Sequence, residues 1–427
     1  MKNNDIIFIG LMLFALFFGA GNLIFPPFLG MESGTSFLPA MTGFIITGVS
    51  LPFLAVMAIA LSKDGITSIG QRVHPIFGII FAILVYLAIG PFFGIPRGAS
   101  VSFEMGIAPF LSKPSGSELF IFTLIFFIVT LLLSLNPTKL VDTVGQYLTP
   151  ALLLAIALLC IAAFFQFDSP AGAPSVKYED APFVKGFIEG YLTMDTIAAL
   201  AFGIVVISAI KDKGITDQKT IIKYTMAAGL IAAVGLALVY GSIGWIGVHM
   251  PGADQFDNGA AILTYASSLL FGSAGKVVLA VIVALACLTT CIGLTSACAQ
   301  FFAEKWPRLS YKWYVVLFTV ISFFIANLGL NTIISVSVPV LVMLYPFAIV
   351  LVVLSLLQPA AGKSRGMYVG AIILTAVYSI NDGLTAFGFN IEGFTKVIGW
   401  VPFFDSGLGW IVPAAAGAIL GRFIKAK

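Results

Sequence analysis

Charged residues are scarce in this sequence, and their scarcity excludes most classes of soluble protein. Only 10% of the 427 residues are charged, whereas a typical soluble domain has roughly 25%. Hydrophobic residues make up 59% of the chain, and the mean hydropathy is +1.07. A soluble fold cannot hide so much apolar surface, because a sizeable part of any folded chain faces water. The composition therefore indicates a polytopic membrane protein.

Histidine and cysteine are also scarce. The chain has two His and four Cys, which argues against most metal enzymes and against a disulfide framework. The net charge of +3 is small and evenly spread, so we expect no nucleic-acid partner. No stretch is polar enough to form a separate soluble domain, and no obligate protein partner is evident. We expect neither an enzyme nor an organic cofactor, because no cluster of His, Cys and acidic residues is present.

Twelve apolar segments are candidate membrane-spanning helices, each of which needs about 20 apolar residues. The runs are continuous, unlike the alternating strands of outer-membrane barrels, so we expect helices in an inner or plasma membrane. The apolar N-terminus runs on into Pro26 and Pro27, which favours a span over a cleaved signal peptide. The predicted segments are 6–28, 36–61, 75–95, 118–135, 140–166, 184–210, 221–248, 274–303, 312–328, 332–357, 367–381 and 399–423.

Two further stretches are ambiguous or short. Residues 97–112 either extend the third helix or form a short surface helix. Residues 252–272 are too long for a turn, and their apolar run predicts a short helix over the outer mouth.

Basic residues set the expected orientation. Alternating the twelve segments across the bilayer places 16 of the 22 Lys and Arg on the side of the N-terminus. Cytoplasmic loops carry such an excess, so both termini are expected in the cytoplasm. The 6 basic residues on the outer side are Arg97, Lys113, Lys177, Lys185, Lys276 and Lys396.

Two apolar segments contain glycine and polar residues near their midpoints. In the first segment these are Gly19, Ala20, Gly21 and Asn22, and in the sixth they run from Gly190 to Asp195. Lipid supplies no water to satisfy freed backbone groups, so an unwound stretch must face protein or a polar cavity. The N-termini of half-helices attract a carboxylate, while unwound carbonyls attract a cation or an ammonium group.

The two breaks hold corresponding places in segments 1–5 and 6–10. Five is odd, so the second set enters the membrane from the opposite side, which is typical of an inverted-repeat transporter. The pattern predicts one transmembrane domain over 1–427, with repeats at about 6–166 and 184–357. Two additional helices then follow at about 367–423.

Simpler interpretations remain open for these residues. Gly19 and Gly21 could serve only close helix packing. Asp195 lies inside the membrane by this count, so it could bind a cation, meet a substrate ammonium or carry a proton. Alternatively it caps the second half of its helix, with Thr193 assisting. Glu189 is expected on a solvated outer face, and Arg97 is expected as an interfacial anchor near Glu104.

The eighth segment carries a stripe of hydroxyl and other small residues. Thr289 and Thr290 offer hard oxygen ligands that suit Na⁺, although Ser and Thr also bond back to the preceding turn. Cys287, Cys291 and Cys298 share a face without a nearby His, so we interpret them as small packing residues and expect no metal site beyond a coupling cation.

Several motifs along the chain occur together. They are FGAGNLIFPP at 18–27, GPFF at 90–93, IPR at 95–97, SFEMG at 102–106, GYLTMD at 190–195 and the pair Thr289–Thr290. With them the chain resembles, over essentially its whole length, the bacterial branched-chain amino acid carriers of the leucine/isoleucine/valine:cation symporter family. That family is similar in architecture to the sodium-coupled leucine transporter fold. The resemblance implies twelve helices, a 5+5 inverted repeat with discontinuous helices 1 and 6, and alternating access.

The resemblance also implies roles for individual residues. Asn22 matches a sodium ligand in the first break. Thr289 and Thr290, with Glu304 at the helix end, match a second sodium site completed by backbone oxygens of Ala15 and Phe18. Thr193 matches a hydroxyl near the substrate, and Asp195 departs from the usual pattern. The expected substrate-binding residues are Phe17, Gly19, Ala20, Gly21, Tyr191, Thr193 and Asp195, with Phe18 and Tyr86 as further candidates for the lining.

The expected function is uptake of Leu, Ile and Val across a bacterial inner membrane, coupled to Na⁺ or to H⁺. The lipid bilayer and the small substrate are the expected partners. The same fold carrying another small solute is the first alternative, and an ion channel is the second. A membrane enzyme is the third.

Overall fold

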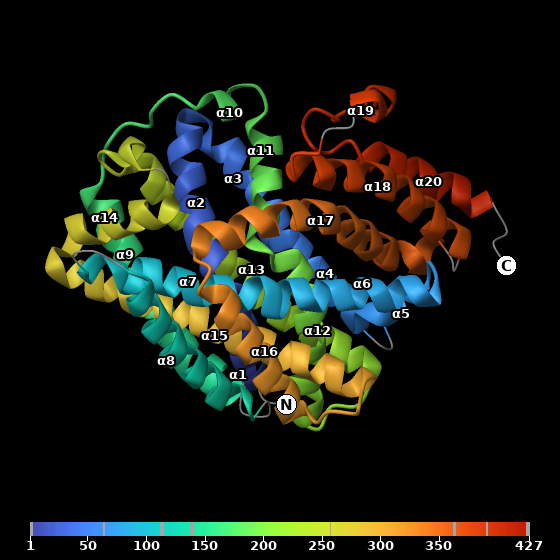
Figure 1. Ribbon diagram of the computed structural model, residues 1–427, viewed down its shortest axis with the longest axis horizontal. Helices are drawn as coiled ribbons and strands as arrows, with labels where there is room; N and C mark the ends of the chain where they lie inside the picture. Colours follow the sequence, from blue (N-terminus) through green and yellow to red (C-terminus); the bar gives the residue numbers. More distant parts are fainter. Residues whose placement is uncertain are drawn as a thin grey trace.

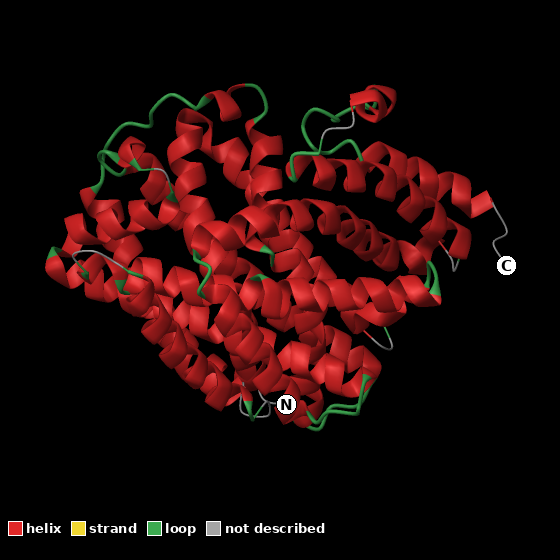
Figure 2. Ribbon diagram, viewed as in Figure 1, coloured by secondary structure: helices red, strands yellow, loops and turns green. Residues whose placement is uncertain are grey.

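The computed structural model describes residues 3–62, 65–111, 115–136, 141–256, 258–361, 364–389 and 392–423, and these residues form helices joined by short loops, with no strand among them (Figure 1, Figure 2). In lipid a helix satisfies its own backbone groups, which is why long apolar runs adopt it. The predicted all-helical membrane fold is confirmed for this part of the chain. Seven basic residues used for the orientation lie outside it: Lys2, Lys63, Lys113, Lys139, Lys363, Lys425 and Lys427.

The first half of the chain forms nine α-helices. They are α1 (Asn3–Phe17), α2 (Ala20–Ser33), α3 (Phe37–Ile45), α4 (Leu51–Ala60), α5 (Gly65–Gln71), α6 (Pro75–Leu87), α7 (Gly94–Gly106), α8 (Gly116–Ser134) and α9 (Thr149–Gln166). The 3₁₀ helix η1 (Gly34–Ser36) and three π-helical stretches connect or extend them. These stretches are η2 (Ile46–Ser50), η3 (Ala88–Phe92) and η6 (Val141–Leu148).

The second half forms eleven. They are α10 (Val176–Glu179), α11 (Pro182–Glu189), α12 (Asp195–Asp212), α13 (Gln218–His249), α14 (Gly259–Phe271), α15 (Ser273–Lys305), α16 (Tyr311–Ala326), α17 (Leu330–Ala361), α18 (Arg365–Ala386), α19 (Glu392–Ile398) and α20 (Ile411–Phe423). The turn η7 (Gly190–Thr193) lies between α11 and α12. The short helix predicted within 252–272 is α14, which packs on α2 and α15.

Fewer helices qualify as spans than the twelve predicted. Among the described residues, eight are long and apolar enough to cross a membrane, or nine if the bent pair α11–α12 is one span. The continuous helical stretch Ala20–Ala60 is counted as one span, although it includes parts of two predicted segments. The helices Asn4–Phe17, Tyr311–Ala326 and Ile411–Phe423 are shorter than a full span.

One boundary prediction is wrong. The helix predicted at 399–423 begins only at Ile411, because residues 400–410 are mostly turns in which Phe403 has a φ of 67°. Of the two interpretations of residues 97–112, extension of the third helix is confirmed as far as Gly106: the helix kinks at Gly90, which has non-helical backbone angles, and resumes as α7. This continuation places Arg97 inside the protein.

The helices that carry the two breaks lie at the centre of the bundle. The halves α1 and α2 both pack on α13, while α12 packs on α4 and α11 on α3 (Figure 1). Glycine permits the closest of these approaches: a Cβ on Gly30 would lie 1.9 Å from the carbonyl oxygen of Gly244, and one on Gly186 would lie 1.8 Å from that of Ala40. Large apolar side chains point outwards on the peripheral helices, such as Ile121 and Phe165, as expected of a surface that faces lipid.

Candidate functional site

The first helix is interrupted where the sequence predicts it. The α1 helix ends at Phe17, Gly19 is extended with a φ of −121°, and α2 begins at Ala20. The amide of Gly19 donates to Oδ1 of Asn22 over 3.1 Å. The first N–H groups of a helix have no partner within the helix, so the start of α2 presents donors at the break.

The second interruption lies between η7 and α12. Met194 has a left-handed backbone conformation with a φ of 71°, and the two halves meet at an angle of 46°. The Thr193 hydroxyl donates to the carbonyl of Gly190 over 2.9 Å, and it accepts the amide of Asp195 at 3.4 Å. The break therefore frees carbonyls at the end of η7 and places Asp195 at the start of α12.

Side chains join the two breaks. Nδ2 of Asn22 donates to Oδ2 of Asp195 over 2.6 Å and also contacts the hydroxyl of Tyr240. That hydroxyl donates to the same carboxylate oxygen over 2.9 Å. Asp195 is 2% exposed. Its carboxylate is held by side chains rather than by backbone amides, so the capping interpretation of Asp195 is wrong within the described residues.

Arg97 of α7 reaches the second break, which the sequence analysis did not foresee. It is 6% exposed, and its Nη1 and Nη2 donate to the carbonyls of Leu192 at 2.9 Å and Thr193 at 3.2 Å. The prediction that Arg97 is an interfacial anchor near Glu104 is wrong, because the helix continues past the kink at Gly90. Glu189 is likewise not on a solvated face: it is buried and paired with Lys177.

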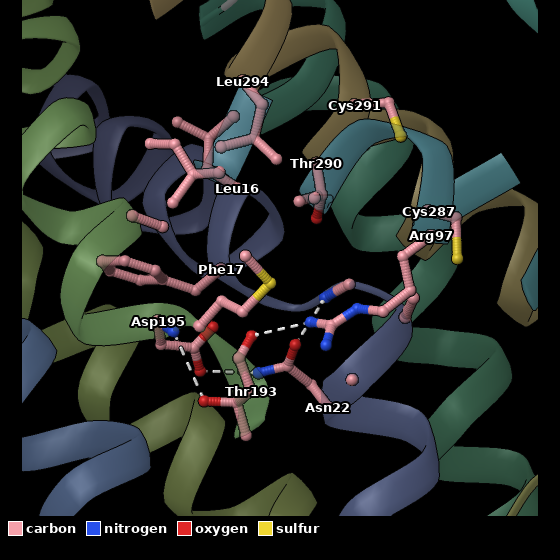
Figure 3. Close-up of a pocket in the computed structure, with 18 residues that line it drawn as sticks. Leu16, Phe17, Asn22, Arg97, Thr193, Asp195, Cys287, Thr290, Cys291 and Leu294 are labelled. Carbon is pink, nitrogen blue, oxygen red and sulfur yellow. Dashed lines mark hydrogen bonds between the residues drawn. The ribbon is translucent and has the colours of Figure 1, made fainter. Parts of the chain in front are cut away.

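A small cavity of about 30 Å³ lies between the breaks (Figure 3). Its apolar wall includes Leu16, Phe17 and Leu294, and its polar wall includes Arg97 and Asp195. Of the expected substrate-binding residues the cavity brings together Phe17, Gly19, Ala20, Gly21, Thr193 and Asp195. Asn22 and Thr290, expected at cation sites, also line it.

Both glycines of the first break are in close contact with other helices. A Cβ on Gly19 would lie 2.9 Å from the hydroxyl oxygen of Thr290, and one on Gly21 would lie 2.9 Å from Nη2 of Arg97. The structure therefore supports both interpretations of these residues, since the glycines lie at the break and also permit close approach.

Three of the residues expected at the second cation site, Ala15, Thr289 and Thr290, converge beside the cavity, whereas Glu304 is exposed and contacts Lys305. The hydroxyls of Thr289 and Thr290 both donate to the carbonyl oxygen of Ala15 over 3.1 Å. Thr289 also bonds back to Ala286 over 3.0 Å. Three oxygens from α1 and α15 thus lie together, the donor type that suits Na⁺.

Three expected residues point elsewhere. Tyr191 stacks on Tyr345 with ring centroids 4.6 Å apart, and Tyr86 stacks on Phe301 at 4.1 Å. Phe18 stacks on Phe14 at 5.4 Å. None of the three lines the cavity. Their side chains pack against other aromatic rings instead of facing the expected substrate.

The cysteines pack as small residues. Cys291 donates to the carbonyl of Ile95 at 3.5 Å and Cys298 to that of Tyr86 at 3.2 Å. No group of three or more His, Cys, Asp or Glu within the described ranges could hold a metal ion.

A helical membrane bundle with two interrupted central helices around a cavity defines the class of the protein as a multi-pass membrane transporter. A model of the family described as "Branched-chain amino acid transport protein" matches residues 2–427. The chain belongs to this family.

The curated relatives are named as permeases and carriers, not as enzymes. The chain is 45% identical to "Branched-chain amino acid permease BrnQ" of Bacillus subtilis over 424 residues, covering 98% of this chain and 96% of the relative. It is 44% identical to "Branched-chain amino acid permease BraB" of the same organism over 420 residues, with 98% and 94% covered. It is 46% identical to "Branched-chain amino acid transport system 2 carrier protein" of Pseudomonas aeruginosa over 428 residues, with 98% and 96% covered.

Proposed function

We propose that this protein imports Leu, Ile and Val by symport with a cation, Na⁺ in the first instance, through alternating access. The observation that carries the proposal is the convergence of both helix breaks on one cavity, with the oxygens of Ala15, Thr289 and Thr290 beside it. The relatives are named for the transport of branched-chain amino acids, and this supplies the substrate class.

The groups that line the cavity suit a zwitterion with an apolar side chain, and the helices must move apart to admit it. The donors at the start of α2 attract the carboxylate, and the carboxylate of Asp195 attracts the ammonium group. Leu16, Phe17 and Leu294 offer an apolar surface to the branched side chain. Na⁺ at Thr289 and Thr290 would tie α1 to α15 and so favour one arrangement of the first break, which is how binding of the two solutes becomes coupled.

The proposed architecture is twelve spans in a 5+5 inverted repeat with both termini in the cytoplasm of a bacterium. The packing supports a two-fold relation. Both halves of the first broken helix pack on α13, the helix that follows the second break. Both halves of the second broken helix pack on α3 and α4, which follow the first break. A two-fold rotation that places the first repeat on the second would therefore convert the contacts of α1 and α2 into those of α11 and α12.

Proton coupling is the second candidate, and the buried carboxylate of Asp195 favours it, because ionisable residues inside the membrane often carry protons. One experiment separates the two. Labelled leucine uptake is measured in proteoliposomes under an inward Na⁺ gradient at equal pH, and under an inward proton gradient without Na⁺. Accumulation only with Na⁺ supports the proposal, whereas accumulation only with protons contradicts sodium coupling and supports the second candidate, in which Asp195 carries the proton. Competition by unlabelled Ile, Val and other solutes defines the substrate range, and linear, unsaturable flux would indicate a channel.

A further inference from the structure

Arg97 carries a positive charge into the cavity without a direct ion pair. Its side chain is buried, and within the described part of the chain no contact within 4.0 Å joins it to any acidic residue. Asp195 lines the same cavity and supplies an opposite charge there, but its carboxylate bonds to Asn22 and Tyr240 instead of to the guanidinium. Two buried charges that share a cavity without direct contact are costly, so their presence calls for an explanation.

The guanidinium has hydrogen-bonding capacity that the protein does not use. Two of its five N–H groups donate to the carbonyls of Leu192 and Thr193. Nε is buried and has no partner among the described residues. Figure 3 shows the guanidinium reaching from α7 towards Thr193 and Asn22. The carbonyls of η7 thus fix its orientation and leave donors for another group.

The start of α2 lies against the same guanidinium. A Cβ on Gly21 would lie 2.9 Å from Nη2 of Arg97, so the first turn of α2 and the arginine border one part of the cavity. The helix start carries partial positive charge and unpaired N–H groups. Arginine forms charge-assisted bonds to a carboxylate with two parallel N–H donors. Both features attract the same anionic, planar group.

We propose that the guanidinium of Arg97, together with the first N–H groups of α2, binds the carboxylate of the transported amino acid and so makes a free α-carboxylate a requirement for transport. Asp195 then faces the ammonium group, and the two protein charges balance the two charges of the zwitterion. This inference rests on the proposed function, because it assigns a ligand group to the same cavity.

The arrangement also explains why the arginine is held by carbonyls. Those carbonyls belong to the second break, whereas the N–H donors belong to the first. A carboxylate between Arg97 and α2 therefore connects the two broken helices through the substrate itself. An amine or an amide analogue lacks the anionic end and leaves the guanidinium without its counter-charge.

The test measures binding of leucine and of leucinamide, in which a neutral carboxamide replaces the carboxylate, to the purified full-length protein in sodium. For the wild type we expect leucine to bind about 10- to 100-fold more tightly, the range of a lost bond to a charged group. In Arg97→Gln leucine affinity falls by that factor while leucinamide affinity changes little, so the preference disappears. Arg97→Lys keeps the charge and retains part of the preference. Arg308→Gln, in an exposed loop, is the matched control and keeps the wild-type ratio.

A measurement on the wild type covers the case in which Arg97→Gln does not fold. The chain has five Arg, so solid-state NMR can detect contact between ¹³C-carboxyl leucine and ¹⁵N-labelled guanidinium groups. Strong dipolar dephasing that persists in Arg308→Gln supports the inference. Bound leucine without dephasing overturns it, as does an Arg97→Gln protein that keeps the wild-type ratio. If the wild type transports leucine and either of these results is found, only this inference is overturned and the proposed function stands. If the wild type does not bind leucine, the proposed function and the inference are both contradicted.

Discussion

The side-chain amide of Asn22 donates to the carboxylate of Asp195 over 2.6 Å, and this bond joins two helix breaks that are 173 positions apart in the chain. Tyr240 of α13 contacts both side chains. The three residues form a polar bridge across the centre of an otherwise apolar bundle. If one broken helix moves relative to the other, these hydrogen bonds must break, or the three residues must move together.

Replacing Asp195 with Asn tests the role of its charge. The amide keeps nearly the same shape, so the contacts with Asn22 and Tyr240 largely survive, while the counter-charge for the substrate ammonium disappears. We expect leucine affinity to fall by about 10- to 100-fold. Thermal stability should hold or rise, because a buried carboxylate is costly. Equilibrium leucine binding and melting curves of the purified variant check this, and unchanged leucine affinity would exclude Asp195 from the binding site.

Replacing Thr290 with Ala tests the cation site. The change removes one of the three oxygens that converge at Ala15, so the sodium concentration for half-maximal leucine uptake should rise by about tenfold, the value of one bond to a charged group. Maximal uptake at saturating sodium should change less. Thr290→Ser keeps the hydroxyl and serves as the control. If the alanine variant shows the wild-type sodium dependence, sodium does not bind at Thr290.

Two glycine substitutions should distinguish an effect on substrate binding from an effect on helix packing. In Gly21→Ala the new methyl group meets Nη2 of Arg97 at 2.9 Å and the backbone Cα of Thr193 at 3.2 Å, so it disturbs the guanidinium and its bonds to η7. We expect weaker leucine binding and a smaller loss of stability than in Gly30→Ala. In Gly30→Ala the methyl group meets the backbone of Gly244 at 1.9 Å, so the helices must separate and stability should fall by about 1–3 kcal/mol. Melting curves and leucine binding of both variants check this contrast, and a reversed pattern would contradict it.

Lys177 connects the end of α2 with the end of α11 that adjoins the second break. Its Nζ lies 3.0 Å from Glu32 at the end of α2 and also pairs with Glu189 at the end of α11. Lys177→Met leaves the buried Glu189 without this partner, so contact between α2 and α11 should weaken. We expect faster labelling of the cavity residues Cys287 and Cys291 by a membrane-impermeant thiol reagent from outside, in a Cys160→Ser background.

Lys185→Met is the matched control for Lys177, because no ion pair of Lys185 is found among the described residues. Equal labelling rates in wild type and Lys177→Met would show that the pair does not hold the outer side closed. Burial lowers the pKa of Lys177, but the carboxylates of Glu189 and Glu32 outweigh it and raise the pKa above its ordinary 10.5. The lysine therefore keeps its charge up to alkaline pH and loses it only as the pH rises through the raised pKa, while at acid pH the contact is lost when the two carboxylates are protonated.

The sequence predicts both helix breaks because glycine and polar residues inside an apolar span have few structural explanations in lipid. It also predicts the convergence of Thr289, Thr290 and Ala15, although through family resemblance rather than spacing. Helix lengths were less predictable, since kinks and turns such as 400–410 are themselves apolar. Tyr191 was misplaced because the direction of its side chain depends on the unwound backbone around it.

Arg97 and Tyr240 are the functional candidates that the sequence reasoning missed. Gly90 and Pro91 suggest the end of a helix, so Arg97 was assigned to the membrane surface. The interpretation of residues 97–112 as an extension of the third helix is the one that places Arg97 inside the protein. Tyr240 lies within a long apolar run without any motif, and only the fold brings it to Asp195.

The most direct test of the central claim is reciprocal binding to the purified protein at fixed pH. If both breaks form one site in which leucine and sodium stabilise the same arrangement, leucine affinity increases with sodium concentration. Sodium affinity then increases with leucine by the same factor. Leucine binding that is identical with and without sodium would contradict a shared site.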